Sequence, residues 1–287
     1  MTTRRFSVVT DSTADITPEI AEENGITVVP LSVSFGAETH SDGEMSQQEF
    51  FDRMRSAPTL PTTSQPPVGA FVEAYERALE TAESVVSVHI SNKLSGTIES
   101  ARQAAEQFAG RVHVFDSLSL SWGLAMQVLD AARSAAGGLG ADAALIRLDR
   151  LRPNVKLIVG LDSLDNLAKG GRIGKVSAFL GAMLNLKVTL TVDKDGSFIP
   201  VARTRGEGAA LEHTLEWIAQ QMGSETRGSF AVGHALSLER AHRLADALRE
   251  RYEIEDLFVY EAGSVICTHT GTGWGIACVP GGLSAQR

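Results

Sequence analysis

The stretch SVVSVHISNKLSGTIESARQAAEQF, residues 84–108, decides the fold class. Residues 84–90 form a short apolar run, which is typical of a buried strand. Residues 97–108 carry apolar side chains at helical spacing, and only the loop 91–96 separates the two segments. A strand that passes into a helix through so short a loop is typical of a parallel sheet with helices on its faces.

The same alternation extends through residues 5–136. Thr17 followed by Pro18 predicts the start of a helix, and Gly25 predicts its end. The predicted strands are 5–10, 26–33, 84–90 and 112–115, and the further predicted helices are 66–81, 97–108 and 118–136. We therefore predict an N-terminal domain, residues 1–155, with a doubly wound and mostly parallel sheet.

The second half of the chain has a different pattern. Two alternating runs, 187–192 and 198–203, flank an Asp-Gly turn and predict a hairpin. The other predicted strands are 155–160, 228–234 and 257–261, and the predicted helices are 207–222 and 238–252. This order favours a C-terminal α+β layered domain, residues 156–287.

Composition excludes several classes of protein. The chain has 287 residues and a formal net charge of -9, which argues against non-specific binding of nucleic acid. It has two cysteines, at a spacing that fits no zinc pattern, and no apolar run long enough to span a bilayer. We expect a soluble protein of the reducing cytoplasm.

Three segments lie where strands end and helices begin, the edge at which doubly wound sheets bind ligands. They are TDSTAD (10–15), TTSQPP (62–67) and SNKLSGT (91–97). The last two place hydroxyls before a helix, whose free N–H groups hold an anion readily. The structural alternative is that Ser64, Ser95 and Thr97 only cap their helices.

Two glycine-rich segments are also candidates. LAKGGRIGK, residues 167–175, lacks the spacing of a phosphate-binding Walker loop, but its glycine pair directs the cation of Arg172. Gly170 is alternatively a plain helix cap. CTHTGTGWG, residues 267–275, contains a weak G-x-G signal, and its His269 is either a ligand-binding or a structural side chain.

Taken together, these segments resemble the signatures of the DegV family. The similar segments are, in order, VVTDSTADI, GITVVPLSVSFG, DGEMS, TTSQP, ISNKLSGTIESA, FDSLSLSWGL, LDNLAKGGRIG, DKDGSFIPVARTRG and HTGTG, and they run from Val8 to about Cys278. Members of this family include the fatty-acid-binding subunits of bacterial fatty acid kinase.

The resemblance implies a two-domain α/β protein with a ligand tunnel between the domains. One long-chain fatty acid lies in the tunnel, and a separate ATP-dependent kinase subunit phosphorylates its carboxylate to an acyl phosphate. The binding protein itself is not expected to be an enzyme or to hold a metal or cofactor. The residues that match the family's carboxylate site are Thr63, Ser95, the Gly96 backbone, Arg172 and His269. Thr272 and Val188 stand where the family usually has proline.

Physical reasoning adds three expectations. Burial of roughly fifteen methylenes offers about 12 kcal/mol before costs, so the polar groups need only orient the carboxylate. Residues 176–186, rich in Phe, Leu and Met, form either a tunnel wall or a core helix. Arg203, Arg205 and Lys175 are either solvated or form a basic patch for the kinase subunit or an anionic membrane surface.

We assign the residues of TTSQPP to two different roles. We expect Ser64 or Gln65, with the prolines, to begin the helix, and Thr63 to lie just outside it and contact the carboxylate.

Two other functions compete with the carrier. One is a hydrolase that uses Ser95 or Ser12 with His269, although no Gly-x-Ser-x-Gly motif is present. The other is a sensor of a smaller carboxylate metabolite, which shares the anion site but not the tunnel.

Overall fold

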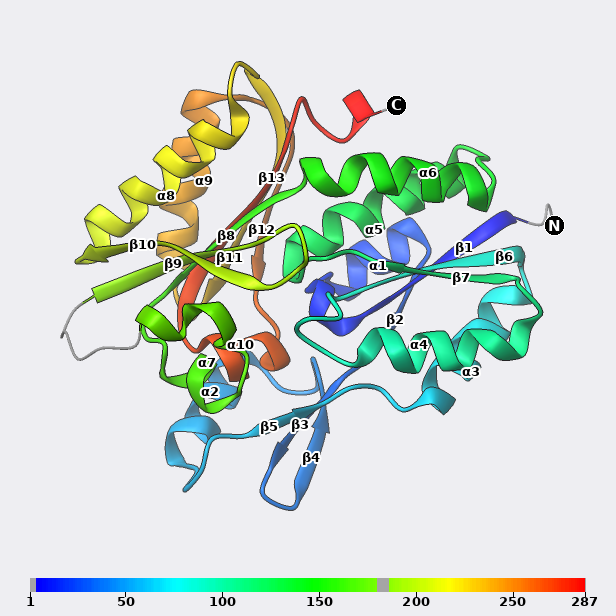
Figure 1. Ribbon diagram of the computed structural model, residues 1–287, viewed down its shortest axis with the longest axis horizontal. Coiled ribbons are helices and arrows are strands. Elements are labelled where there is room, and N and C mark those ends of the chain that lie inside the picture. Colours follow the sequence, from blue (N-terminus) through cyan, green and yellow to red (C-terminus); the bar gives the residue numbers. More distant parts are fainter. Residues whose placement is uncertain (1–3, 180–185, 287) are drawn as a thin grey trace.

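The computed structural model describes residues 4–179 and 186–286 (Figure 1). Its N-terminal sheet has four parallel strands in the order β2-β1-β6-β7. The strands are β1 (Arg4–Asp11), β2 (Ile26–Val29), β6 (Ala82–His89) and β7 (Val112–Asp116). β6 and the helix after it are the strand and helix predicted from residues 84–108.

Helices cover both faces of this sheet, which confirms the doubly wound arrangement. Side chains alternate along β1, so that Val8 belongs to one hydrophobic core and Val9 to another. The helices beside Val9 are α3 (Val68–Leu79) and α4 (Thr97–Ala105), and those on the Val8 side are α1 (Pro18–Asn24), α5 (Ser121–Ala136) and α6 (Ala141–Leu151).

The single strand predicted over 26–33 was wrong. Pro30 separates β2 from β3 (Ser32–Phe35), because proline offers no backbone N–H to continue the ladder. β3 instead joins a small antiparallel sheet in the order β4-β3-β5. Its other strands are β4 (Glu38–Ser41) and β5 (Thr62–Ser64), and α2 (Gln47–Ser56) lies between them in sequence.

The TTSQPP motif is a strand followed by a helix. Helix α3 begins after Pro67 with no side-chain cap, so the expectation that Ser64 or Gln65 starts the helix was wrong. Ser64 instead pairs with Ser32 in the small sheet, and the Gln65 amide donates to Ser100 Oγ at 2.8 Å. Thr63 lies on a strand, which fixes its position more firmly than a loop would.

The C-terminal sheet has six strands in the order β10-β9-β8-β13-β11-β12. They are β8 (Lys156–Leu161), β9 (Leu186–Val192), β10 (Phe198–Arg205), β11 (Arg227–Ala235), β12 (Glu253–Glu261) and β13 (Gly273–Pro280). β9 and β10 form the predicted hairpin. Helices α8 (Glu207–Met222) and α9 (Leu238–Arg251) pack on one face.

One hydrophobic core joins the two larger sheets. It contains Phe6 from β1, Trp122 from α5, Leu157 from β8 and Ala277 from β13. Figure 1 shows α5 between the N-terminal sheet and the C-terminal strands, where its Trp122 ring lies 4.3 Å from that of Phe258. The domain boundary at residue 155 stays a prediction, since burial runs continuously across it. Among the described residues, no helix is long and apolar enough to cross a membrane.

Two short helices close the lower edge of the six-stranded sheet. They are α7 (Asp165–Lys169) and α10 (Ser264–Thr270), and Figure 1 shows them between that sheet and the small sheet of β3, β4 and β5. This packing brings α10 and β5, far apart in sequence, into contact.

Candidate functional site

Four of the five predicted site residues line one cavity, which we call the mouth cavity. Thr63 comes from β5, Ser95 from the loop before α4, Arg172 from the segment after α7 and His269 from α10. Gly96 adjoins them as the residue before α4. The fold therefore gathers side chains from four separate segments around one cavity.

Thr63 and His269 form a hydrogen-bonded pair, with 2.8 Å between Thr63 Oγ1 and His269 Nε2. Burial, and then the charge of Arg172, lower the pKa of His269 to about 4, so its imidazole is neutral at pH 7. His269 Nδ1 is buried without a partner among the described residues. An orphan acceptor is more common than an orphan N–H, which favours the tautomer with hydrogen on Nε2. His269 then donates to Thr63, and the Thr63 hydroxyl is free to donate into the cavity.

Ser95 also has a hydroxyl that is free to donate into the cavity, because of its contacts with Thr97. Ser95 Oγ accepts from the Thr97 backbone N–H at 3.2 Å and lies 2.8 Å from Thr97 Oγ1. Since Thr97 is buried, its hydroxyl proton is best placed on Ser95. Ser95 thus has its own proton to donate to a ligand. It also accepts from the first N–H group of α4, although the N-cap residue of that helix is Gly96 and not Ser95.

Gly96 and Arg172 complete the polar end of the mouth cavity. A Cβ at Gly96 would lie 2.1 Å from Gln65 Oε1, so a larger residue there would displace the Gln65 side chain from its bond to Ser100. The guanidinium of Arg172 donates from Nε to Leu94 O at 3.2 Å and from Nη1 to Gly170 O at 2.8 Å. These bonds fix an exposed cation at the edge of the cavity.

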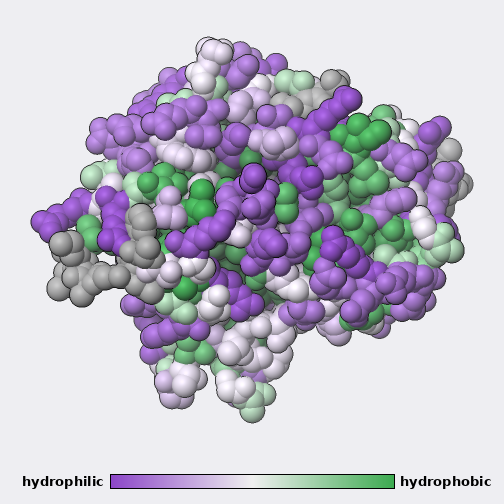
Figure 2. Space-filling view, in the orientation of Figure 1, coloured by the Kyte–Doolittle hydropathy of each residue, from purple (hydrophilic) through white to green (hydrophobic). Residues whose placement is uncertain are grey.

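A second cavity, which we call the inner cavity, adjoins the mouth cavity. Both are lined by Leu120, Ile266 and Thr270, so the two share a wall. The inner cavity is mainly apolar, with side chains from β8, β11, β12, β13, α5 and α10 around it. On the face shown in Figure 2, hydrophilic residues surround scattered hydrophobic patches. The apolar lining residues Leu157, Leu161 and Trp274 are buried, so this lining belongs to the interior of the fold.

Small residues on adjacent strands make room for the inner cavity. Gly275 of β13 pairs with Gly233 of β11 and with Val159 of β8, so all three face the same side of the sheet. Gly273 pairs with Ala235 and Leu161 in the next such row. The Tyr260 ring fills the space over Gly233, where a Cβ would lie 2.3 Å from Tyr260 Cζ, whereas a Cβ at Gly275 would make only ordinary contacts. The small residues therefore leave a trough at Gly275, with the larger side chains of β8 along one side.

A buried polar network forms part of the inner wall. Ser121 Oγ donates to Asp15 Oδ2 at 2.5 Å and lies 2.8 Å from Tyr260 Oη. The backbone N–H of Gly263 donates to Asp15 Oδ1 at 2.9 Å. Burial is the main cause that raises the pKa of Asp15 to about 8. The network ties the N-terminal sheet to β12 and α10, and sequence reasoning missed it.

The protonated state of Asp15 predicts how stability depends on pH. With a pKa of about 8 in the folded state, above the unfolded value of 3.8, Asp15 holds a proton in the folded chain alone between these pH values. Stability contributed by this group therefore falls as pH rises from about 4 to 8. We expect Asp15→Asn to remove this loss, because the amide reproduces a neutral carboxyl group.

Urea unfolding from pH 5 to 9 measures this effect. The free energy of unfolding of Asp15→Asn minus that of the wild type should increase as pH rises. The increase should be at least about 1.4 kcal/mol, which corresponds to one pKa unit. Asp142→Asn, at an exposed position, is the control and should follow the wild type. Parallel curves for Asp15→Asn and the wild type would contradict the prediction.

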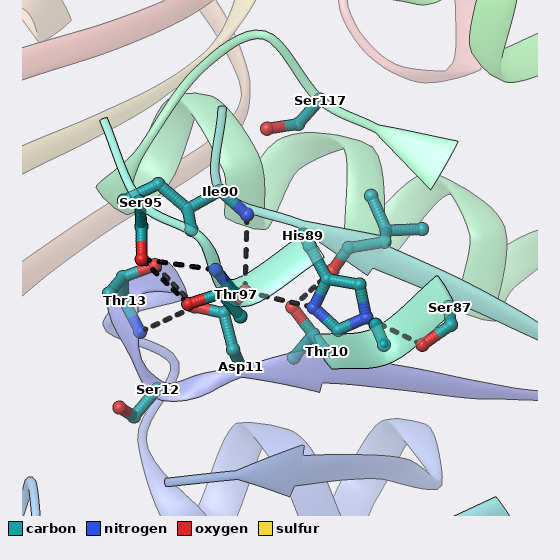
Figure 3. A network of polar contacts seen from close by, with 12 residues as sticks. Thr10, Asp11, Ser12, Thr13, Ser87, His89, Ile90, Ser95, Thr97 and Ser117 are labelled. Carbon is teal, nitrogen blue, oxygen red and sulfur yellow. Dashed lines mark hydrogen bonds and ion pairs between the residues drawn. The ribbon is translucent and has the colours of Figure 1, made fainter. Parts of the chain in front are cut away.

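The serine and histidine pairs of the hydrolase alternative do not form. His269 Nε2 contacts Thr63, while Ser95 contacts Thr97 and Ser12 Oγ accepts from Leu31 N at 3.0 Å. Another Ser–His–Asp chain exists at Ser87, His89 and Asp11 (Figure 3), but all three residues are fully buried. A substrate cannot reach it.

Other predictions have mixed outcomes. Of the expected tunnel wall, Val176 is buried in the core and residues 180–185 lie outside the described residues. Lys175 forms an ion pair with Asp193 at 2.5 Å, whereas Arg203 and Arg205 lie exposed on β10, at the sheet edge. Thr272, in place of the family's usual proline, donates to Asp162 Oδ2 at 2.8 Å and so anchors the turn before β13.

The fold and the two cavities define a class of α/β proteins with two large sheets, a small third sheet, and a polar cavity beside an apolar one. Comparison with known proteins agrees. A family model described as "Uncharacterised protein, DegV family" matches residues 5–281. A DegV domain-containing protein of Deinococcus radiodurans is 38% identical over 281 residues, covering 96% of this chain and 98% of its own. This chain belongs to the DegV family.

Solved structures of relatives have the same fold. A DegV family protein of Thermus thermophilus, described as binding fatty acid, has a TM-score of 0.90 and 36% identity, over 96% of this chain and 99% of its own. DegV of Bacillus subtilis, described as a fatty acid binding protein, has a TM-score of 0.87 and 30% identity, over 97% and 99%.

Proposed function

We propose that this protein binds one long-chain fatty acid and presents its carboxylate to a separate ATP-dependent kinase subunit. The acyl chain occupies the inner cavity, and the carboxylate occupies the mouth cavity. The observation that carries this proposal is that the polar mouth cavity and the apolar inner cavity share the lining residues Leu120, Ile266 and Thr270. The protein acts as a carrier and performs no catalysis alone.

The acyl chain and the polar groups contribute different amounts of binding free energy and so have different roles. Each buried methylene contributes about 0.8 kcal/mol, so a long chain dominates affinity. The hydroxyls of Thr63 and Ser95 each add about 1 kcal/mol, the usual net value of a hydrogen bond. Their role is orientation of the carboxylate, assisted by the start of α4 beside Gly96 and by the charge of Arg172.

The arrangement leaves the carboxylate available for reaction. Neutral hydroxyls bind through single hydrogen bonds, whereas an arginine fork occupies both oxygens. Arg172 cannot offer its Nε side as a two-bond fork, because Nε already donates to Leu94 O, and one Nη1 N–H group donates to Gly170 O. One oxygen therefore stays open to attack the phosphate of ATP supplied by the kinase subunit, without metal or cofactor bound to this chain.

Arg203 and Arg205 supply a contact surface for that partner. They alternate on one face of the edge strand β10, and Phe198 at the start of the same strand lines the mouth cavity. We assign this face to the kinase subunit, with brief contact with an anionic membrane during lipid exchange. The setting is the cytoplasm, where Cys267 and Cys278 remain free thiols.

Competition binding tests the proposed function and separates it from a sensor of small carboxylates. Long-chain acids should displace a bound fluorescent fatty acid, and each two-carbon shortening should weaken displacement about tenfold, as about 1.6 kcal/mol of burial is lost. Displacement by acetate or propionate as effective as by palmitate would overturn the carrier and support the sensor.

A further inference from the structure

Thr13 lines the mouth cavity, but the proposed carboxylate site gives it no role. It belongs to the TDSTAD segment, which ends β1 at the ligand-binding edge of the parallel sheet. The residue is completely buried within the fold, and so is the carboxyl group of Asp11 beside it. This segment was singled out by sequence, yet the carboxylate site described above uses none of its side chains.

Asp11 holds two lining residues of the mouth cavity in place (Figure 3). Its Oδ1 accepts from the backbone N–H of Thr13 at 3.1 Å and from the Thr13 hydroxyl. Its Oδ2 accepts from the backbone N–H of Ile90 at 3.1 Å and contacts His89 Nδ1 at 2.9 Å. Ile90 also lines the mouth cavity. Asp11 thus fixes β1 and β6 against each other where the sheet meets the site.

Behind Asp11, the network continues away from the cavity. His89 Nε2 lies 2.6 Å from Ser87 Oγ, which lies 2.9 Å from Tyr75 Oη. Every one of these side chains is buried, and the Phe71 ring packs edge-on against His89. Buried networks whose members are all satisfied are rigid, so Asp11 has little freedom to turn.

The direction of the Thr13 hydrogen bond follows from the chemistry of its partner. A carboxylate only accepts, and the backbone N–H groups of Thr13 and Ile90 donate to the two oxygens of Asp11. Thr13 must therefore give its hydroxyl proton to Asp11, and its oxygen offers only lone pairs to any other group. A bound carboxylate, which also offers only lone pairs, is repelled from this side of the cavity.

We infer that Thr13, fixed by Asp11, is a positioning residue that turns the oxygens of a bound carboxylate away from β1 and towards Thr63 and Ser95. This inference rests on the proposed binding of a fatty acid. Thr63 and Ser95 offer protons to the carboxylate, whereas Thr13 offers only lone pairs, so one orientation of the carboxylate is favoured over the others. Affinity depends little on Thr13, because the acyl chain supplies most of it.

Nuclear magnetic resonance of bound palmitate, labelled with ¹³C at the carboxyl carbon, tests the orientation separately from affinity. The wild type should give one sharp bound resonance. Thr13→Val, which keeps the shape but removes the hydroxyl, should displace or split it, with Kd changed less than about threefold. Thr13→Ala is a second variant without the hydroxyl and should act likewise, whereas Thr13→Ser should restore the wild-type resonance.

Thr10→Val is the matched control. Thr10 is also a buried threonine at the end of β1, and its hydroxyl donates to Val88 O at 2.8 Å (Figure 3). This variant loses a hydrogen bond of similar kind without altering the mouth cavity, so its resonance should match the wild type. An unmoved resonance in the two variants without the hydroxyl, or an equal displacement in Thr10→Val, overturns the inference alone. A wild type that binds no palmitate overturns the proposed function, and this inference with it.

Discussion

Valine in place of Gly275 should raise the Kd for long-chain fatty acids about a thousandfold. A Cβ at Gly275 meets Ile158 O at 3.5 Å, Val159 Cγ2 at 3.9 Å and Tyr260 Oη at 4.0 Å. These are ordinary contacts, so the strand accepts a side chain there. The added branches fill the trough of the inner cavity and exclude about five methylenes of the ligand, worth about 4 kcal/mol.

Binding curves for acids of graded length measure this loss. Gly275→Val should bind short acids that stop before the trough about as well as the wild type. For longer acids its affinity should no longer increase with chain length. Gly208→Val is the matched control, because a Cβ at Gly208 meets nothing within 4 Å. Equal gain with length in Gly275→Val and the wild type would show that the chain does not lie over β13.

Removal of both hydroxyls, in Thr63→Ala/Ser95→Ala, should lower phosphorylation of bound fatty acid about a hundredfold or more. Misplacement of a reacting group by about 1 Å costs that much. The Kd should rise less than about tenfold, because two hydrogen bonds of neutral groups contribute little beside the acyl chain. Binding and phosphorylation are thus expected to separate in this variant.

A purified fatty acid kinase catalytic subunit with ATP provides the assay, with the fatty acid held at saturation. Ser64→Ala is the control, since Ser64 is the exposed neighbour of Thr63 on the same strand. It should support phosphorylation at the wild-type rate. Unchanged turnover in the double variant would remove Thr63 and Ser95 from the proposed site.

The sequence predicted the fold class because local patterns carried it. The run 84–90 and the helical spacing of 97–108 mark β6 and α4, and the Asp-Gly turn marks the hairpin of β9 and β10. The division of 26–33 at Pro30 was missed, since its apolar pattern runs unbroken across two sheets.

The inner cavity was beyond sequence reasoning for a physical reason. β13 lies at the centre of the six-stranded sheet, but its start, GWG, offers the glycines of a loop rather than the branched residues of a strand. Glycine at 275 leaves the trough open, whereas a Cβ at Gly273 would lie 2.2 Å from Gly160 O, so glycine there permits the close approach of two backbones. Glycine thus has a structural role at both positions, although it is not typical of a central strand.

The mouth cavity was predicted in part. Thr63, Ser95, Arg172 and His269 were found through the family resemblance, and the structure brings them together. Neither the role of Thr13 nor the network of Asp15, Ser121 and Tyr260 was predicted. The sequence around a hydroxyl or carboxyl residue does not indicate which residue of another sheet it will contact. Only the packing of α5 between the sheets brings these groups together.

Mass spectrometry of the lipid released from freshly purified, denatured protein tests the central claim most directly. The account predicts one long-chain fatty acid per chain in the wild type, and shorter acids or none in Gly275→Val prepared in parallel. Repeated wild-type preparations that release no long-chain acid, and that do not take one up when palmitate is added, would contradict it.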